Sequence, residues 1–151
     1  MAGTNFFILY ASHFIRAVLR GLKAKEEGGR MKPGIDLKTR TRDFALRVIR
    51  CYTALLKSTE AQVIGRQLLR SGTSVGAHYR EAQRSRSNAE FISKIEGGLQ
   101  ELEEAMYWME LLIGAGIVKE QLLEALRNEA NEIMAILVTC TKKVKSSSRG
   151  Y

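Results

Sequence analysis

The first side chains to consider are two serines that precede a histidine at helical spacing. Ser71, Ser74 and His78 follow one another at intervals of three and four residues, so on a helix a hydroxyl and an imidazole base could share one face. Neither serine lies in a G-x-S-x-G elbow, and no acid is placed as a third triad member. Packing of small residues explains this stretch better than catalysis does, and we expect no enzymatic activity.

A metal centre or a bound cofactor is not expected either. Di-metal sites in helical bundles use Glu-x-x-His pairs, and neither His13 nor His78 has a glutamate three residues before it. Cys51 and Cys140 fall on or beside apolar stripes, where a cysteine behaves as a small hydrophobe. The glycines between residues 65 and 76 match no phosphate-binding motif.

Phosphate binding is the chemistry that the residue types favour most. Five arginines fall between residues 66 and 86, and more cations follow near the C-terminus. A guanidinium donates two parallel hydrogen bonds to phosphate. No base-reading motif is present, so contact with RNA or DNA would use the backbone and its shape. The candidate nucleic-acid-binding residues are Arg66, Arg70, Arg80, Arg84, Arg86, Lys142, Lys143 and Lys145, with Arg149 in the same tail.

Solvated helix surface and salt bridges to an acidic segment remain alternative explanations of these cations. The net charge is +8, from 24 basic and 16 acidic residues, which suits a polyanionic partner. Residues 66–86 carry five basic groups and one acidic group, whereas residues 87–132 carry three and ten. Residues 32–50 carry six and two, and residues 133–151 carry four and none. Such blocks are compatible with pairing inside one subunit or with another copy.

Four stretches with apolar residues at helical spacing must position these side chains. The first runs from about residue 38 to residue 57, the second over 64–82, the third over 87–114 and the last over 122–144. In 151 residues, 45% of them hydrophobic, with a single proline, this pattern excludes a many-turned β-sandwich. Short connections between long amphipathic helices predict an all-α fold, an antiparallel up-down-up-down four-helix bundle.

Two local features sharpen the helix boundaries. Residues 71–77 have poor helix propensity, but the apolar stripe continues through them, which predicts a helix whose small residues admit a close neighbour. Ser87 and Glu90 form a capping box that opens the third helix. The residues expected to share one buried core are Phe91, Ile95, Leu102, Met109, Leu126, Ile133 and Leu137.

The chain divides into residues 1–30, a bundle over 31–145 and a flexible tail over 146–151. The apolar run at 6–22 contains His13, Arg16 and Arg20, which do not suit a membrane-spanning helix. The codons of residues 25–30 are compatible with a bacterial ribosome-binding sequence ahead of Met31. We therefore expect translation to start at Met31 and exclude residues 1–30 from the fold.

Two linked motifs resemble a known family. The stretch QLLRSGTSVGAHYREA at 67–82, followed by EFISKI at 90–95 and by the 104–112 segment, resembles the bacterial four-helix-bundle family that includes proteins encoded by 23S rRNA intervening sequences. His78 stands where that family usually has Asn, and Gly97-Gly98 replace aliphatic residues or Ala. The motif residues to which the resemblance gives structural roles are Ser71, Ser74, Gly76, Glu81, Phe91, Glu104, Tyr107 and Trp108.

The resemblance implies a cytoplasmic bacterial bundle that has no known catalytic activity and assembles as a ring-shaped homopentamer. A related branch of the family is the accessory variability protein of diversity-generating retroelements. The resemblance to that branch implies a basic pentamer that binds nucleic acid and a reverse transcriptase. The leading hypothesis is a non-enzymatic homo-oligomer that contacts RNA or another nucleic acid through basic surface. The alternative is a protein-interaction accessory subunit of an enzyme such as a reverse transcriptase.

Glu81 and Glu104 match two recurrent acids of the family. Because a buried carboxylate needs a cationic partner, we expect both acids to be partly buried and to meet Arg70 or Arg80. Such a contact would join the second and third helices. The alternative is that both acids lie in solvent.

Overall fold

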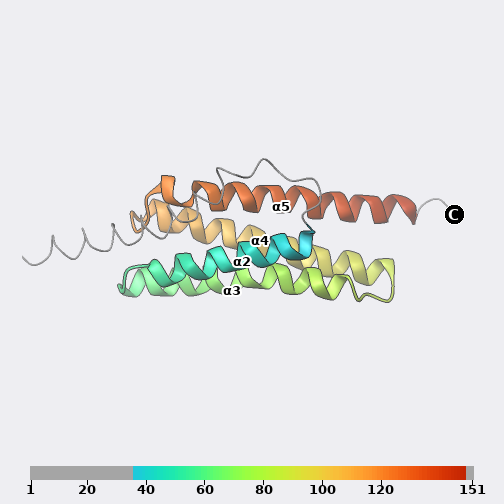
Figure 1. Cartoon of the computed structure of the whole chain (residues 1–151), viewed down its shortest axis with the longest axis horizontal. Helices are drawn as coiled ribbons and strands as arrows, with labels where there is room; N and C mark the ends of the chain where they lie inside the picture. The colour runs from blue at the N-terminus through green and yellow to red at the C-terminus, as the bar shows by residue number, and fades with distance from the viewer. Residues whose placement is uncertain (1–35, 149–151) are drawn as a thin grey trace, which may run out of the picture.

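The computed structural model describes residues 36–148, and these residues fold into four long helices joined by short turns (Figure 1). The helices are α2 (Leu37–Ala54), α3 (Thr59–Ala82), α4 (Asn88–Gly114) and α5 (Glu120–Ser147). Each helix runs antiparallel to the next (Figure 1). The described part of the chain is therefore the predicted all-α, up-down-up-down four-helix bundle.

Neighbours around the bundle follow chain order. α3 packs against α2 and α4, and α5 packs against α4 and α2, while the diagonal pairs do not pack together. The α3–α4 contact is the most extensive and the α2–α5 contact is the smallest. α2 has only 18 residues against 28 in α5, so α3, α4 and α5 extend beyond it at the end that contains the α3–α4 turn (Figure 1).

Side-chain caps set three of the helix starts, of which the sequence pattern predicted the one at Ser87. The Ser58 hydroxyl accepts from the Ala61 amide at 3.3 Å, and the Ser87 hydroxyl accepts from the Glu90 amide at 3.1 Å. The Glu90 carboxylate accepts from the Arg86 amide at 2.8 Å, one residue before the partner that a standard capping box uses. Asp36 caps α2 by accepting from the Lys38 amide. The predicted start of the third helix is confirmed.

The small residues of α3 lie in a continuous helix, as predicted, and three glycines bring it close to α2. A Cβ on Gly72 would lie 2.8 Å from a methyl carbon of Val48, and a Cβ on Gly76 would lie 3.3 Å from the Thr41 hydroxyl. A Cβ on Gly65 would likewise meet the Leu55 side chain. The low helix propensity of this stretch is therefore offset by tertiary packing.

The core contains six of the seven residues predicted for it; Ile95, Leu102, Met109, Leu126, Ile133 and Leu137 are all buried. Phe91 is only half-buried and packs against the edge of this core, because it lies in the first turn of α4 at the end that α2 does not cover. In α5 the buried position near the C-terminus is Thr141 rather than Cys140 or Val144. The Thr141 hydroxyl donates to the Val138 carbonyl at 2.8 Å, which satisfies the polar group there.

The chain ends differ from the predicted boundaries in two respects. α5 continues through Ser147, two residues beyond the boundary predicted at residue 145. The expectations for residues 1–30, for Met31 and for Arg149 lie outside the described residues. No helix within residues 36–148 is both long and apolar enough to cross a membrane.

Candidate nucleic-acid interface

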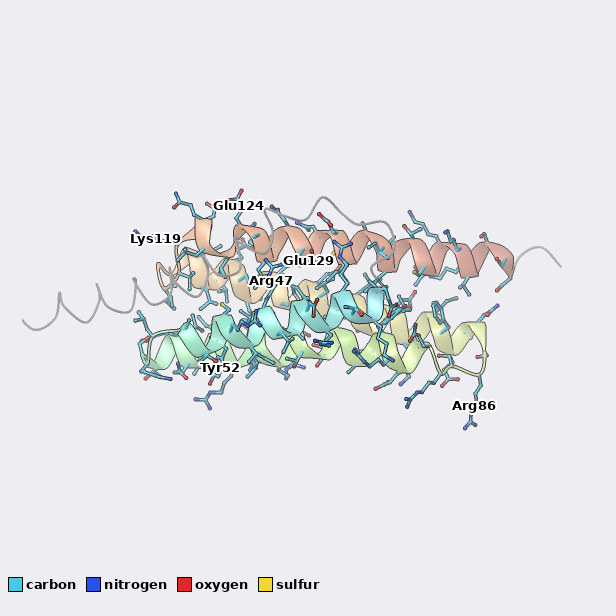
Figure 2. The ribbon with its side chains drawn as sticks, viewed as in Figure 1. Arg47, Tyr52, Arg86, Lys119, Glu124 and Glu129 are labelled. Carbon is cyan, nitrogen blue, oxygen red and sulfur yellow. The ribbon has the colours of Figure 1, made fainter. Side chains whose placement is uncertain are left out.

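Cations from separate parts of the chain meet at one end of the bundle, which consists of the α3–α4 turn and the last turns of α5. The Asn88 side-chain amide donates to the Ser148 hydroxyl at 3.1 Å, and the Lys145 ammonium lies 2.9 Å from the Glu96 carboxylate. These two contacts fix the C-terminal end of α5 against the start of α4. Figure 2 shows Arg86 directed outward at this end.

Four of the predicted cations at this end are exposed and unpaired. The side chains of Arg84 and Arg86 follow α3, and those of Lys142 and Lys143 lie on the last turns of α5. None of the four makes an ion pair with a residue of the 36–148 stretch, whereas Lys145 is paired with Glu96. We call Arg84, Arg86, Lys142 and Lys143 the basic end. Unpaired cations on a surface are free to exchange counterions for phosphate.

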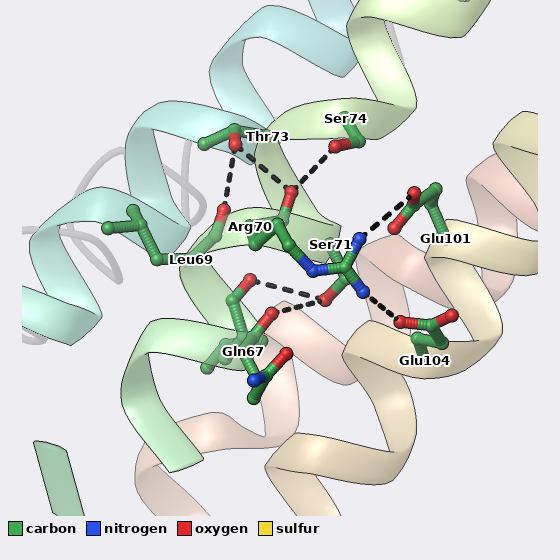
Figure 3. A network of polar contacts seen from close by, with 9 residues as sticks. Gln67, Leu69, Arg70, Ser71, Thr73, Ser74, Glu101 and Glu104 are labelled. Atoms are coloured by element: carbon green, nitrogen blue, oxygen red, sulfur yellow. Dashed lines mark hydrogen bonds and ion pairs between the residues drawn. The ribbon is translucent and has the colours of Figure 1, made fainter. Parts of the chain in front are cut away.

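Arg70 has a different role, because it joins α3 to the acidic helix α4. Its guanidinium lies 2.5 Å from the Glu104 carboxylate and 3.4 Å from that of Glu101 (Figure 3). The predicted ionic contact between the second and third helices is confirmed for Glu104. The predicted burial of Glu104 is wrong, since its side chain is 46% exposed, whereas Glu101 is 17% exposed.

Glu81 does not meet an arginine. Its carboxylate lies 2.7 Å from the Lys94 ammonium on α4; Glu81 is exposed and Lys94 is half-buried. The hydrogen bond from Lys94 lowers the pKa of Glu81. The prediction of a partly buried acid with an Arg70 or Arg80 partner is therefore wrong for Glu81. The side chain of Lys94 on the neighbouring helix is the cation that contacts its carboxylate.

Arg80 and Arg66 use backbone carbonyls rather than carboxylates. Arg80 donates to the Gly76 carbonyl at 2.9 Å and to the Lys38 carbonyl at 3.3 Å, which connects α3 to the first turn of α2. Arg66 donates to the Gln62 carbonyl of its own helix at 3.3 Å. At 1.5 Å per helical residue, Arg66 lies roughly 25 Å along α3 from the basic end, so the five arginines do not form one cluster.

The motif residues of α3 and α4 act in packing and helix geometry. The Ser71 hydroxyl donates to the Gln67 carbonyl at 2.9 Å, and the Ser74 hydroxyl donates to the Arg70 carbonyl at 2.7 Å (Figure 3). Neither hydroxyl uses His78 as a partner. On α4 the rings of Tyr107 and Trp108 lie 5.1 Å apart, with Tyr107 exposed and Trp108 half-buried.

The cysteines and carboxylates offer no reactive arrangement in the described part of the chain. Burial raises the pKa of the Cys51 thiol to about 11, which keeps it protonated and weakly nucleophilic at neutral pH. No group of three potential metal ligands occurs among residues 36–148.

Sequence reasoning missed the ionic contact between α2 and α5. Arg40 donates to Glu129 at 2.6 Å and also pairs with Glu132. The hydrogen bond from Arg40 to Glu129 is the main cause that raises the pKa of Arg40. The only signal in the sequence was the position of Glu129 beside Ala130 on the apolar stripe of the last helix.

Fold and site together define a class: a basic four-helix bundle whose polar residues connect helices and leave cations free at one end. The model of the 23S rRNA-intervening sequence protein family matches residues 35–139. The chain belongs to this family, as the sequence motifs indicated.

A solved structure supports the assignment. A protein of unknown function from the S23 ribosomal protein family of Bacteroides thetaiotaomicron VPI-5482 is 36% identical, with a TM-score of 0.67. The match covers 71% of this chain and 99% of that protein. No curated protein matches the chain.

Proposed function

We propose that this protein is a non-enzymatic, cytoplasmic homo-oligomer that binds RNA or another nucleic acid through the basic end. The observation that carries the proposal is the gathering of Arg84, Arg86, Lys142 and Lys143 at one end without carboxylate partners in the described chain. Arg70 and Lys145, by contrast, are engaged by acids of α4. The family description, which refers to 23S rRNA intervening sequences, supports an RNA ligand.

A homo-oligomer would repeat the basic end around a symmetry axis. The family resemblance implies that this oligomer is a pentamer. Each subunit then needs to supply only one or two phosphate contacts, because the contacts of all subunits act on one polyanion. Arginines and lysines on a turn and a helix end present no array of side chains for reading base edges. Binding is therefore expected to depend weakly on sequence and strongly on salt.

A filter-binding titration of structured RNA and duplex DNA at two salt concentrations tests the proposal. The oligomer is first confirmed by light scattering, so that the ligand meets the assembled protein. We expect binding at low salt that weakens steeply as salt rises. If a confirmed oligomer binds neither ligand at low salt, the proposal fails and the protein-partner function, an accessory subunit of an enzyme such as a reverse transcriptase, takes its place.

A further inference from the structure

Large apolar side chains are exposed at four places in the described part of the chain. Tyr107 on α4 is 52% exposed, and Ile49 on α2, Leu56 in the α2–α3 turn and Val63 on α3 are exposed as well. Exposed apolar groups with polar residues at their rim are typical of protein-binding surfaces. Two such surfaces are present, and their charges are opposite.

The first surface is a shallow groove of about 260 Å³ between α4 and α5, which we call the α4–α5 groove. Met106, Tyr107 and Met134 line it with apolar surface. Glu103 and Glu110 also line it; both are exposed, and neither pairs with a cation of residues 36–148. The remaining lining residue is Arg127, whose guanidinium forms an ion pair with the Glu120 carboxylate at 3.2 Å.

The second surface lies where α2 adjoins α3, and its apolar members are Ile49 on α2 and Leu56 in the turn that joins the two helices. Tyr52 lies between them in sequence and donates from its phenol to the Gln62 side chain at 3.2 Å. Gln62 in turn donates to the Leu56 carbonyl at 2.8 Å. These bonds hold the apolar residues beside α3.

Two arginines accompany this apolar strip. Arg50 follows Ile49 on α2, and Arg66 follows Gly65, whose backbone lies against Leu55 and Tyr52. Both arginines are exposed, and neither has a carboxylate partner in the described chain. We call Ile49, Arg50, Leu56 and Arg66 the α2–α3 edge.

We propose that the α4–α5 groove of one subunit receives the α2–α3 edge of a second copy of this chain. This inference rests on the homo-oligomer of the proposed function and identifies its contact surfaces. Each surface combines apolar groups with unpaired charge, and the charge of one is complementary to that of the other. Because two different surfaces meet, the contact is heterologous and repeats head to tail, which closes a ring when the rotation allows it.

A second copy fits these surfaces better than other occupants do. The carboxylates of Glu103 and Glu110 repel a nucleic acid from the groove. A separate basic protein in the groove would leave Ile49 and Leu56 exposed on every subunit. Only another copy covers both apolar surfaces with one kind of contact.

Charge reversal tests the pairing, with the assembled mass measured by light scattering and folding checked by circular dichroism. We expect Glu103→Lys/Glu110→Lys and Arg50→Glu/Arg66→Glu each to shift the protein toward the 16.9 kDa monomer. The chain with all four changes places lysines opposite glutamates again and restores the assembled mass at the wild-type net charge. Tyr107→Ser, a change at an exposed position, weakens assembly without disturbing the core.

Matched variants separate this contact from nucleic-acid binding. Arg84→Glu/Arg86→Glu changes the net charge by the same amount as Arg50→Glu/Arg66→Glu, the edge variant. Glu81→Lys/Glu96→Lys changes it by the same amount as Glu103→Lys/Glu110→Lys, the groove variant. Both control proteins are expected to keep the wild-type assembled mass. Arg84→Glu/Arg86→Glu is expected to lose RNA binding while staying assembled. The inference is overturned if the wild type is monomeric, if the groove and edge variants keep its mass, or if the four changes together do not restore assembly.

Discussion

The His78 imidazole of α3 lies directly against Gly97 of α4. A Cβ on Gly97 would lie 2.9 Å from His78 Cε1 and 3.0 Å from Nδ1, and a Cβ on Gly98 would lie 3.3 Å from the His78 Cβ. The imidazole therefore occupies the space that a side chain at position 97 would need, and the packing of α3 on α4 at this point depends on both residues.

We predict that Gly97→Ala has opposite consequences in two backgrounds. In the wild type the added methyl meets the imidazole, and overpacking of this kind costs typically about 1–3 kcal/mol. In a His78→Asn background the space is open, and the better helix propensity of alanine stabilises by up to about 1 kcal/mol. Urea unfolding of the wild type, the two single variants and the double variant gives the coupling free energy between positions 78 and 97. Additive effects would show that the two sites are independent.

Leu102→Ala tests the core. Leu102 is fully buried in the middle of α4, so its truncation is expected to cost about 2–5 kcal/mol. Leu56→Ala, at an exposed position in the α2–α3 turn, serves as the matched control and should change the stability of the monomer by less than about 0.5 kcal/mol. A loss below that value for Leu102→Ala would contradict the packing described.

Two arginines at helix contacts are predicted to differ in their contribution to stability. Arg40 is 14% exposed and bonds Glu129 and Glu132 across the sparse α2–α5 contact, whereas Arg70 is 54% exposed. Arg40→Met is expected to cost about 1–3 kcal/mol, since it leaves a partly buried acid without its partner. Arg70→Met should cost less than about 1 kcal/mol. Equal losses in denaturant unfolding would contradict this difference.

Cys51 gives a pH dependence with a definite sign. Its pKa rises from 9.0 to about 11 on folding, so the folded state holds the thiol proton more tightly than the unfolded state does. Relative to a Cys51→Val variant, the wild type should therefore lose stability as the pH rises from about 9 to about 11, by at most about 1.4 kcal/mol per pH unit. Parallel stability curves for the two proteins across pH 8–10 would show that the thiol does not titrate in this way.

Sequence periodicity was sufficient to predict the helices but not the partners of the charged side chains. A buried stripe fixes the phase of a helix to within about one residue, which is why Thr141 could replace Cys140 at the core. Glu81 and Glu104 were correctly placed between the second and third helices. Their ion-pair partners depend on how far side chains reach across the interface between two helices. The spacing of residues along one helix does not reveal this, so it predicted neither the Lys94 partner of Glu81 nor the second contact of Arg70, with the less exposed Glu101.

The salt dependence of nucleic-acid binding should report which arginines touch phosphate. Each phosphate contact contributes about 0.9 to the slope of log K against log salt for duplex DNA and about 0.7 for single strands. Arg84→Gln and Arg86→Gln remove unpaired cations of the basic end, so each is expected to reduce the slope by up to about that amount and to weaken binding equally for unrelated sequences. Arg70→Gln is the matched control, because its guanidinium is already held by Glu101 and Glu104, and it should leave the slope unchanged. A larger loss for Arg70→Gln than for Arg84→Gln would place the ligand on the side of the bundle along α3 and α4 and not at its end.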